Sequence, residues 1–227
     1  MSVFADRRQA GRLLSRVLEK YTRDPCLVVL ALPRGGVPVG FEIATRIGAP
    51  LDVFVVRKLG VPGHEELAMG AVASGGVLVR NKELIHELGI SDEVIDLVEA
   101  DEVEELVRRE QLYRAGRPPL EVSGCTVILV DDGLATGSTM RAAIAGLRQR
   151  HPRRIVVAVP IAAASTCRQI GALVDDMICA VTPEPFVAVG LWYDDFTPTS
   201  DDEVRQLLGQ AQNRPIHRSD TEAQSRG

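Results

Sequence analysis

The chain has 227 residues, of which 45% are hydrophobic and 25% are charged, and its formal net charge is −5. This length suffices for one α/β domain with a full core, although length alone would permit two. The acidic balance argues against general nucleic-acid binding, which usually requires a basic face. No apolar run reaches the roughly 20 residues of a membrane span, so no membrane partner is expected.

The first sixty residues alternate helix and strand signals. Residues 5–21 predict an amphipathic helix, the apolar run 27–32 predicts a buried strand, and 37–47 and 52–57 predict a helix and a second strand. The first helix is expected to pack on the sheet through one apolar face, which consists of Leu13, Leu14, Val17 and Leu18.

The turn after the first predicted strand has the sequence PRGG at 33–36. Its two glycines leave the backbone free, and Arg34 offers a fork of donors that suits phosphate oxygens. Arg57 and Lys58 end the next apolar run, so we expect them at the same edge of the sheet. Taken alone, PRGG is equally typical of an ordinary strand-to-helix turn with a surface arginine.

The middle of the chain predicts a loop and two helices. Residues 58–68 carry proline and glycine and predict a mobile loop, with extended segments near 69–73 and 76–80. The segment 81–116 predicts an inserted helical hairpin, with a short helix at 83–88 and a longer one at 91–115 that begins at Ser91. The apolar stripe of the longer helix is expected to pack in the core or to form a homodimer contact. It consists of Val94, Leu97, Val98, Val103, Leu106 and Val107.

The most informative stretch is VILVDDGLATGST at 127–139. An apolar strand runs into Asp131 and Asp132 and then into a turn that opens a helix at 138–150. Ligands bind at the carboxyl ends of such strands, and a helix start attracts anions. The two acids are therefore placed to accept hydrogen bonds from vicinal hydroxyls of a sugar whose phosphate lies in the turn. The alternative is a strand-to-helix turn with capping Asp and Ser.

Other phosphate motifs do not fit. A Walker loop needs a lysine before its Ser or Thr, whereas Gly137 is followed directly by Ser138 and Thr139. No G-x-G-x-x-G follows a strand either, so the dinucleotide fingerprint is missing.

The stretch 127–139 resembles the 5-phosphoribosyl-1-pyrophosphate (PRPP) motif of the type I phosphoribosyltransferases, and PRGG looks like the pyrophosphate loop of that family. The resemblance implies that Asp131 and Asp132 hold the ribose hydroxyls, and Mg²⁺ directly or through water or those hydroxyls. It implies a pyrophosphate site of Arg34, Gly35, Gly36, Arg57 and Lys58. It implies a 5-phosphate site of Ala135, Thr136, Gly137, Ser138 and Thr139. The implied catalytic residues are Asp131, Asp132, Arg34 and Lys58.

In that family the segment corresponding to 58–68 is a flexible loop that closes over the sugar. By this resemblance His64, Glu65 and Glu66 contact the substrate on closure. The alternative is that these residues are solvated loop charges.

The C-terminal third predicts a strand at 154–160, a helix at 165–173 and a strand at 177–181, which completes a doubly wound, mainly parallel α/β sheet. The segment that follows, 183–200, corresponds to the family's hood. By resemblance, Phe186, Val187 and Trp192 contact a flat base, and Asp194 and Asp195 meet magnesium or the acceptor. The alternative is an aromatic core cluster under a loop. From residue 210 to 227 we expect a disordered tail, so the predicted domain is 1–209.

Four cysteines are dispersed without C-x-x-C spacing; they are Cys26, Cys125, Cys167 and Cys179. Together with the lack of a signal sequence, this pattern predicts reduced core thiols in a cytoplasmic protein and indicates neither zinc nor disulfides.

The resemblance predicts a Mg²⁺-dependent transferase of nucleotide metabolism that moves the phosphoribosyl group of PRPP to a nitrogen nucleophile, a nucleobase-like acceptor. Two departures count against a purine acceptor of the hypoxanthine-guanine type: Ala135 replaces an acid, and the strand 154–160 ends without a lysine. A regulator that senses PRPP or a nucleotide on the same fold is the main alternative. A phosphosugar hydrolase is a third, but no catalytic His or Cys constellation supports it.

Overall fold

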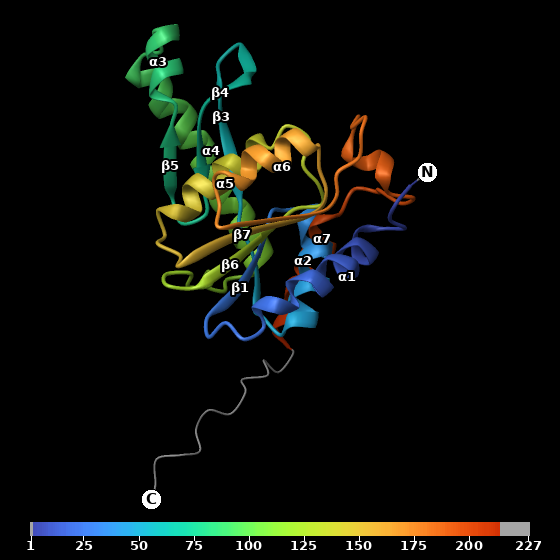
Figure 1. The fold of residues 1–227 in the computed structure, drawn as a ribbon. Coiled ribbons are helices and arrows are strands. Elements are labelled where there is room, and N and C mark those ends of the chain that lie inside the picture. The colour runs from blue at the N-terminus through green and yellow to red at the C-terminus, as the bar shows by residue number, and fades with distance from the viewer. Residues whose placement is uncertain (1, 214–227) are drawn as a thin grey trace, which may run out of the picture.

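The computed structural model describes residues 2–213, with the backbone alone at Glu65 and Glu66, and Figure 1 shows the fold. A five-stranded parallel sheet has the order β2-β1-β6-β7-β8. Its strands are β1 (Leu27–Ala31), β2 (Leu51–Val53), β6 (Thr126–Val130), β7 (Arg154–Ile161) and β8 (Asp176–Val181). Every residue of β6 is buried, as expected for an apolar strand that is covered on both faces.

Helices cover both faces of this sheet, which confirms the predicted doubly wound α/β fold. Alternate residues of β1 belong to different apolar clusters: Val29 packs in one and Val28 in the other. On the Val29 face lie α1 (Arg7–Leu18), α2 (Gly36–Ile47) and α7 (Asp201–Gln212). On the Val28 face lie α5 (Ser138–Arg148) and α6 (Ala164–Gly171). Short 3-10 helices occupy Glu19–Tyr21 and Val189–Trp192.

Helix α1 packs less of its predicted apolar face than expected. Asp6 caps the helix by accepting from the backbone N–H of Gln9 at 2.6 Å. Leu14 and Leu18 are fully buried, but Leu13 and Val17 are exposed. The prediction of a four-residue apolar face is therefore wrong at these two positions, because the buried side of the helix instead includes Ala10, Gly11 and Ser15.

The predicted strand 52–57 and the predicted loop 58–68 are both corrected. Strand β2 ends at Val53, and β3 (Val56–Val61) begins a separate antiparallel sheet with β4 (His64–Ala73) and β5 (Val77–Arg80). The segment 58–68 is thus a β-hairpin whose turn contains Pro62 and Gly63, the latter with a φ of 78°. Proline and glycine marked only this two-residue turn, and the flanking residues pair across the hairpin.

Two helices occupy the segment 81–116: α3 (Lys82–Leu88) and α4 (Asp92–Arg114). We call residues 56–114 the arm, which rises from the main sheet in Figure 1. Within the predicted stripe of α4, Leu106 is buried, whereas Leu97, at 68% exposure, and Val107 lie outside the core of the chain. The buried side of α4 also carries polar groups. Arg114 forms a buried ion pair with Asp52 at 3.0 Å.

The cysteine prediction is wrong. The structure pairs Cys26 with Cys125 and Cys167 with Cys179 in two disulfides. Cys26 and Cys125 immediately precede Leu27 and Thr126, which are partners in the register of β1 and β6. Neighbouring strands therefore bring together two cysteines that lie 99 residues apart in the sequence.

The predicted start of the disordered tail at residue 210 is wrong, because residues 210–212 belong to α7. The rest of the predicted tail, 214–227, lies outside the described residues. The division into a domain at 1–209 with an insertion and a hood stays a prediction. None of the helices within 2–213 combines the length and apolar character that crossing a membrane requires.

Candidate active site

Two loops meet at the carboxyl edge of the central sheet. Strands β1 and β6 are neighbours, with Ala31 opposite Val130, so the loops that follow them leave the sheet side by side. The backbone N–H of Leu32 donates to the carbonyl of Val130 at 2.8 Å. The structure thus brings PRGG and the Asp131–Asp132 pair together, as the sequence predicted.

The glycines of PRGG allow this contact. A Cβ atom on Gly35 would lie 2.6 Å from Cγ of Asp132, and one on Gly36 would lie 2.7 Å from the carbonyl oxygen of Val130. Neither position could therefore carry a side chain without moving the opposing loop. The peptide bond between Pro33 and Arg34 in this loop is cis.

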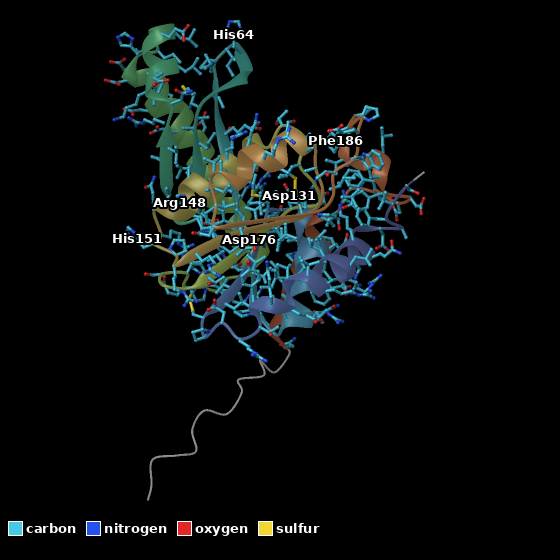
Figure 2. All side chains as sticks on the ribbon, viewed as in Figure 1. His64, Asp131, Arg148, His151, Asp176 and Phe186 are labelled. Atoms are coloured by element: carbon cyan, nitrogen blue, oxygen red, sulfur yellow. A yellow bond between two sulfur atoms is a disulfide. The ribbon has the colours of Figure 1, made fainter. Side chains whose placement is uncertain are left out.

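The two acids are largely withdrawn from solvent. Figure 2 shows Asp131 at the end of the sheet. The backbone N–H of Asp132 donates to Oδ1 of Asp131 at 2.9 Å. Burial raises the pKa of Asp131 well above its ordinary value, and the nearby charge of Asp132 adds to this shift. Burial also raises the pKa of Asp132, against the opposing effect of a hydrogen bond and the positive charge from Arg7.

Arg7 is a site residue that sequence reasoning missed. Its Nε donates to Oδ2 of Asp132 at 2.7 Å, and only 10% of its side chain is exposed. Arg7 is the first residue of α1 and lies outside the apolar face that the sequence predicted. No local pattern linked it to an acid 125 residues away.

Tyr193 was missed as well. Its hydroxyl donates to the backbone carbonyl of Asp132 at 2.6 Å. Burial and the charge of Asp132 raise the pKa of the Tyr193 hydroxyl, so it stays a neutral donor. Its place in an aromatic-rich segment is the one local signal that could have drawn attention to it.

The predicted 5-phosphate loop precedes α5. Gly137 has a φ of 73° and is the N-cap of the helix, which begins at Ser138. The first N–H groups of a helix lack partners within it, so they are available to an anion. The other four predicted phosphate ligands are all exposed; they are Ala135, Thr136, Ser138 and Thr139.

Thr166 supports this loop from α6. Its hydroxyl donates to the backbone carbonyl of Ala135 at 2.7 Å, and its methyl carbon would lie 2.9 Å from a Cβ on Gly137. Leu134 also forms a bridge to Ala162. The loop is therefore held on its inner side and open on its outer side.

The predicted pyrophosphate set is divided. Arg34 is half exposed, with Nη1 3.7 Å from Oδ1 of Asp201 on α7. Arg57 lies on β3 and pairs with Glu102 of α4 at 2.6 Å, so it does not project freely beside PRGG as predicted. Lys58 is exposed on the same strand. Because successive strand residues point to opposite faces, Arg57 and Lys58 leave β3 on opposite sides.

The hood, residues 183–200, packs against the N-terminus. Tyr193 and Phe4 are buried at its centre, and Phe186 and Trp192 pack around them. Val187, by contrast, is 72% exposed. The three predicted base-contacting residues thus differ in environment, and part of the aromatic content forms a small core.

The remaining predicted polar contacts lie away from the acid pair or are engaged elsewhere. Asp195 accepts from the backbone N–H of Thr197 at 2.9 Å, and Asp194 accepts from the hydroxyl of Ser2. Figure 2 shows His64 at the tip of the arm, away from Asp131. The backbone of Glu65 and Glu66 belongs to the same hairpin as His64.

Asp131 and Asp132 are the candidate ligands of a divalent cation at this site. Within 2–213, no group of three or more His, Cys, Asp or Glu side chains is arranged to hold a metal ion. Mg²⁺ commonly binds through one or two carboxylates together with substrate phosphates and water. Asp131 and Asp132 supply two such carboxylates, so they fit Mg²⁺ that arrives with a phosphorylated substrate.

Comparison with known proteins places the chain in a family. A model of the phosphoribosyl transferase domain matches residues 5–194. Two Mycobacterium tuberculosis proteins, each provisionally named a phosphoribosyl transferase, are 43% identical over 211 residues. The match covers 93% of this chain and 47% of each relative, so the chain spans about half the length of these curated relatives.

A solved structure agrees with this placement. The crystal structure of the protein TT1426 from Thermus thermophilus is 40% identical in sequence and superposes with a TM-score of 0.81, over 92% of this chain and 99% of that one. The family match spans the central sheet, the PRGG loop and the loop that carries Asp131 and Asp132. The chain therefore belongs to the phosphoribosyl transferase domain family.

Proposed function

We propose that this protein transfers the 5-phosphoribosyl group of PRPP to a nitrogen nucleophile and releases pyrophosphate. One observation carries the proposal: the PRGG loop, the buried acid pair and the amino end of α5 meet at one edge of the sheet. These are three elements suited to a pyrophosphate, to vicinal hydroxyls and to a phosphate, in the order in which PRPP presents them.

The acid pair would orient the ribose. Asp132 is paired with Arg7, and the oxygens of the two acids keep lone pairs that hydroxyl donors can use. Charged hydrogen bonds of this kind contribute about 1.5 to 3 kcal/mol each. Asp131 and Asp132 would also be the protein ligands of Mg²⁺, directly or through water or the ribose hydroxyls.

The loops would stabilise the two phosphate ends. Backbone N–H groups at 137–139 would bind the 5-phosphate, while Arg34 and the backbone at Gly35 and Gly36 would bind the leaving pyrophosphate. When bound, Mg²⁺ would supply further positive charge that stabilises the leaving pyrophosphate. Lys58 is the proposed second cation, and Arg57 would have to leave Glu102 to take part. No covalent nucleophile is needed, because positioned charges stabilise the separating groups.

The hood would receive the acceptor. Phe186, Val187 and Trp192 are the proposed contacts to a small nucleobase-like molecule. The exposed side chain of Val187 offers apolar surface, and the partly buried rings of Phe186 and Trp192 would form the wall behind it.

Assembly and location complete the proposal. The arm exposes several large apolar side chains, which supports a homodimer contact there; they are Leu67, Leu78, Leu88, Leu97 and Val107. We propose a cytoplasmic role in nucleotide metabolism, without nucleic-acid or membrane partners. Reduced cysteines no longer support a cytoplasmic location, because the four cysteines form two disulfides. The remaining support for this location is the proposed phosphorylated substrate.

Release of pyrophosphate tests the reaction. The protein is incubated with Mg-PRPP and a panel of nucleobases, and pyrophosphate is measured over time. We expect release that depends on one acceptor and is lost in Asp132→Asn but retained in Asp202→Asn, which changes an exposed acid on α7. Tight binding of Mg-PRPP without turnover on any acceptor would instead support a sensor of PRPP.

A further inference from the structure

Arg7 bridges the acid pair and the hood. Its Nε donates to Oδ2 of Asp132 at 2.7 Å, and its Nη1 donates to the backbone carbonyl of Thr197 at 2.8 Å. The guanidinium carbon also lies 3.9 Å from the ring centroid of Phe196. One side chain from α1 therefore touches the carboxylate of the acid pair at one end and two hood residues at the other.

The bridge leaves room for a ligand on the same carboxylate. Arg7 uses Oδ2 of Asp132, and a carboxylate offers about four lone-pair sites on its two oxygens. A ribose hydroxyl that donates to Asp132 would share the carboxylate with Arg7. The rigid guanidinium contacts Asp132, Thr197 and Phe196 at once. A displacement of the Asp132 carboxylate would therefore move the group that contacts Thr197 and Phe196.

The hood has an internal reason to rearrange. Among the residues 2–213, Trp192 is the one whose buried side-chain polar atom, the indole Nε1, has no hydrogen-bond partner. Leaving a buried donor unpaired is unfavourable. A shift of the hood that gives Nε1 a partner would offset part of this cost.

We propose that Arg7 is a positioning residue that couples the phosphosugar site to the hood, so that binding of PRPP at Asp132 changes the environment of Trp192. This inference rests on the proposed function, because it takes PRPP as the ligand of Asp132. It assigns to the N-terminal helix a part in setting the acceptor site after the phosphosugar has bound.

The single tryptophan gives a direct readout. Trp192 is the only tryptophan in the chain, so intrinsic fluorescence reports on the hood. Full-length protein is titrated with Mg-PRPP while emission is recorded, and calorimetry measures binding in parallel. Arg7→Gln removes the bridge. Arg8→Gln is the matched control, because Arg8 is the next residue of α1 and pairs with Glu42.

In wild type and Arg8→Gln we expect the emission of Trp192 to change as Mg-PRPP saturates. In Arg7→Gln we expect calorimetric binding that is about 10- to 100-fold weaker, with no emission change at saturation. Arg7→Lys keeps the positive charge but loses the planar guanidinium that contacts Asp132 and Thr197 together. It should therefore recover much of the affinity for Mg-PRPP and little of the emission response. A merely structural role for Arg7 would not separate these two readouts.

A second variant keeps the test decisive if Arg7→Gln does not fold. Phe196→Leu breaks the link at the hood and leaves Asp132 untouched, so PRPP affinity should stay within about twofold of wild type while the emission response falls. A full emission response in folded Arg7→Gln, or in Phe196→Leu if the former does not fold, overturns the inference. Binding by wild type without any emission change overturns it too. Absence of calorimetric binding by wild type overturns the proposed function, and this inference with it.

Discussion

The carboxyl edge of the central sheet and the arm are built in opposite ways. At the edge, glycine loops approach so closely that one added methyl group on Gly35 would overlap the carboxylate of Asp132. In the arm, partly exposed ion pairs such as Arg57 with Glu102 and exposed apolar side chains such as Leu97 cover the surface. This difference supports the proposal that the ligand binds at the edge, where shape is constrained, and that the arm forms a contact between subunits.

The largest effect is expected from Gly35→Ala. The new Cβ would overlap the carboxylate of Asp132, with only 2.6 Å to its Cγ, so either PRGG or the acid must move. We expect PRPP affinity to fall by more than about 100-fold, because a 1 Å displacement of a binding group can cost that much. Calorimetry with Mg-PRPP measures the loss. Gly209→Ala, where an added Cβ meets nothing within 4 Å, should bind as wild type does.

Gly137→Val tests the phosphate end of the same edge. The side chain would require a φ near 73° and would contact Thr166, so the loop should shift away from the helix axis. We expect loss of ribose 5-phosphate binding by calorimetry. Gly124→Val imposes a similar backbone cost at a φ of 71° in open space, so it should lose stability but keep the ligand. Equal binding by both variants would contradict the assignment of residues 135–139.

Asp132→Asn should have a smaller effect. The amide keeps the shape of the side chain but removes a charged acceptor, so PRPP binding should weaken by about 1.5 to 3 kcal/mol with little loss of folding. Calorimetry and thermal unfolding separate the two quantities. Unchanged affinity in a folded variant would remove Asp132 from the ribose site.

The arm should respond differently. Leu97→Glu places a charge on an exposed apolar residue and should leave PRPP affinity unchanged. If the arm forms the homodimer contact, analytical ultracentrifugation should show a shift toward monomer. Leu13→Glu changes a residue of similar type on α1 and should not alter sedimentation. A wild-type protein that is monomeric at high micromolar concentration would show the dimer proposal to be wrong.

The same contrast explains what the sequence could predict. The motif 127–139 and PRGG are local patterns that follow buried parallel strands, so these patterns, together with the family resemblance, predicted both loops at the carboxyl edge. The part of the hairpin at 58–68 was predicted as a loop because Pro62 and Gly63 dominated the local signal, whereas its strands are held by antiparallel partners.

Long-range contacts account for the residues that were missed. Arg7 reaches Asp132 across 125 positions, and Tyr193 reaches the same residue across 61. Neither contact has a periodicity or spacing that marks it in one sequence. The pairing of Cys26 with Cys125 is of the same kind, because it follows from the order of β1 and β6 in the sheet.

A crystal structure of the protein with Mg²⁺ and PRPP tests the central claim most directly. The account predicts ribose hydroxyls within hydrogen-bond distance of Asp131 and Asp132, and a 5-phosphate on the backbone N–H groups of residues 137–139. The alternative is a surface hollow of about 540 Å³ at the opposite edge of the sheet, whose charged lining is mixed: Lys20, Arg23, Arg153 and Arg154 with Asp24, Asp175 and Asp176. Phosphosugar bound there, with the acid pair free of ligand, would contradict the account.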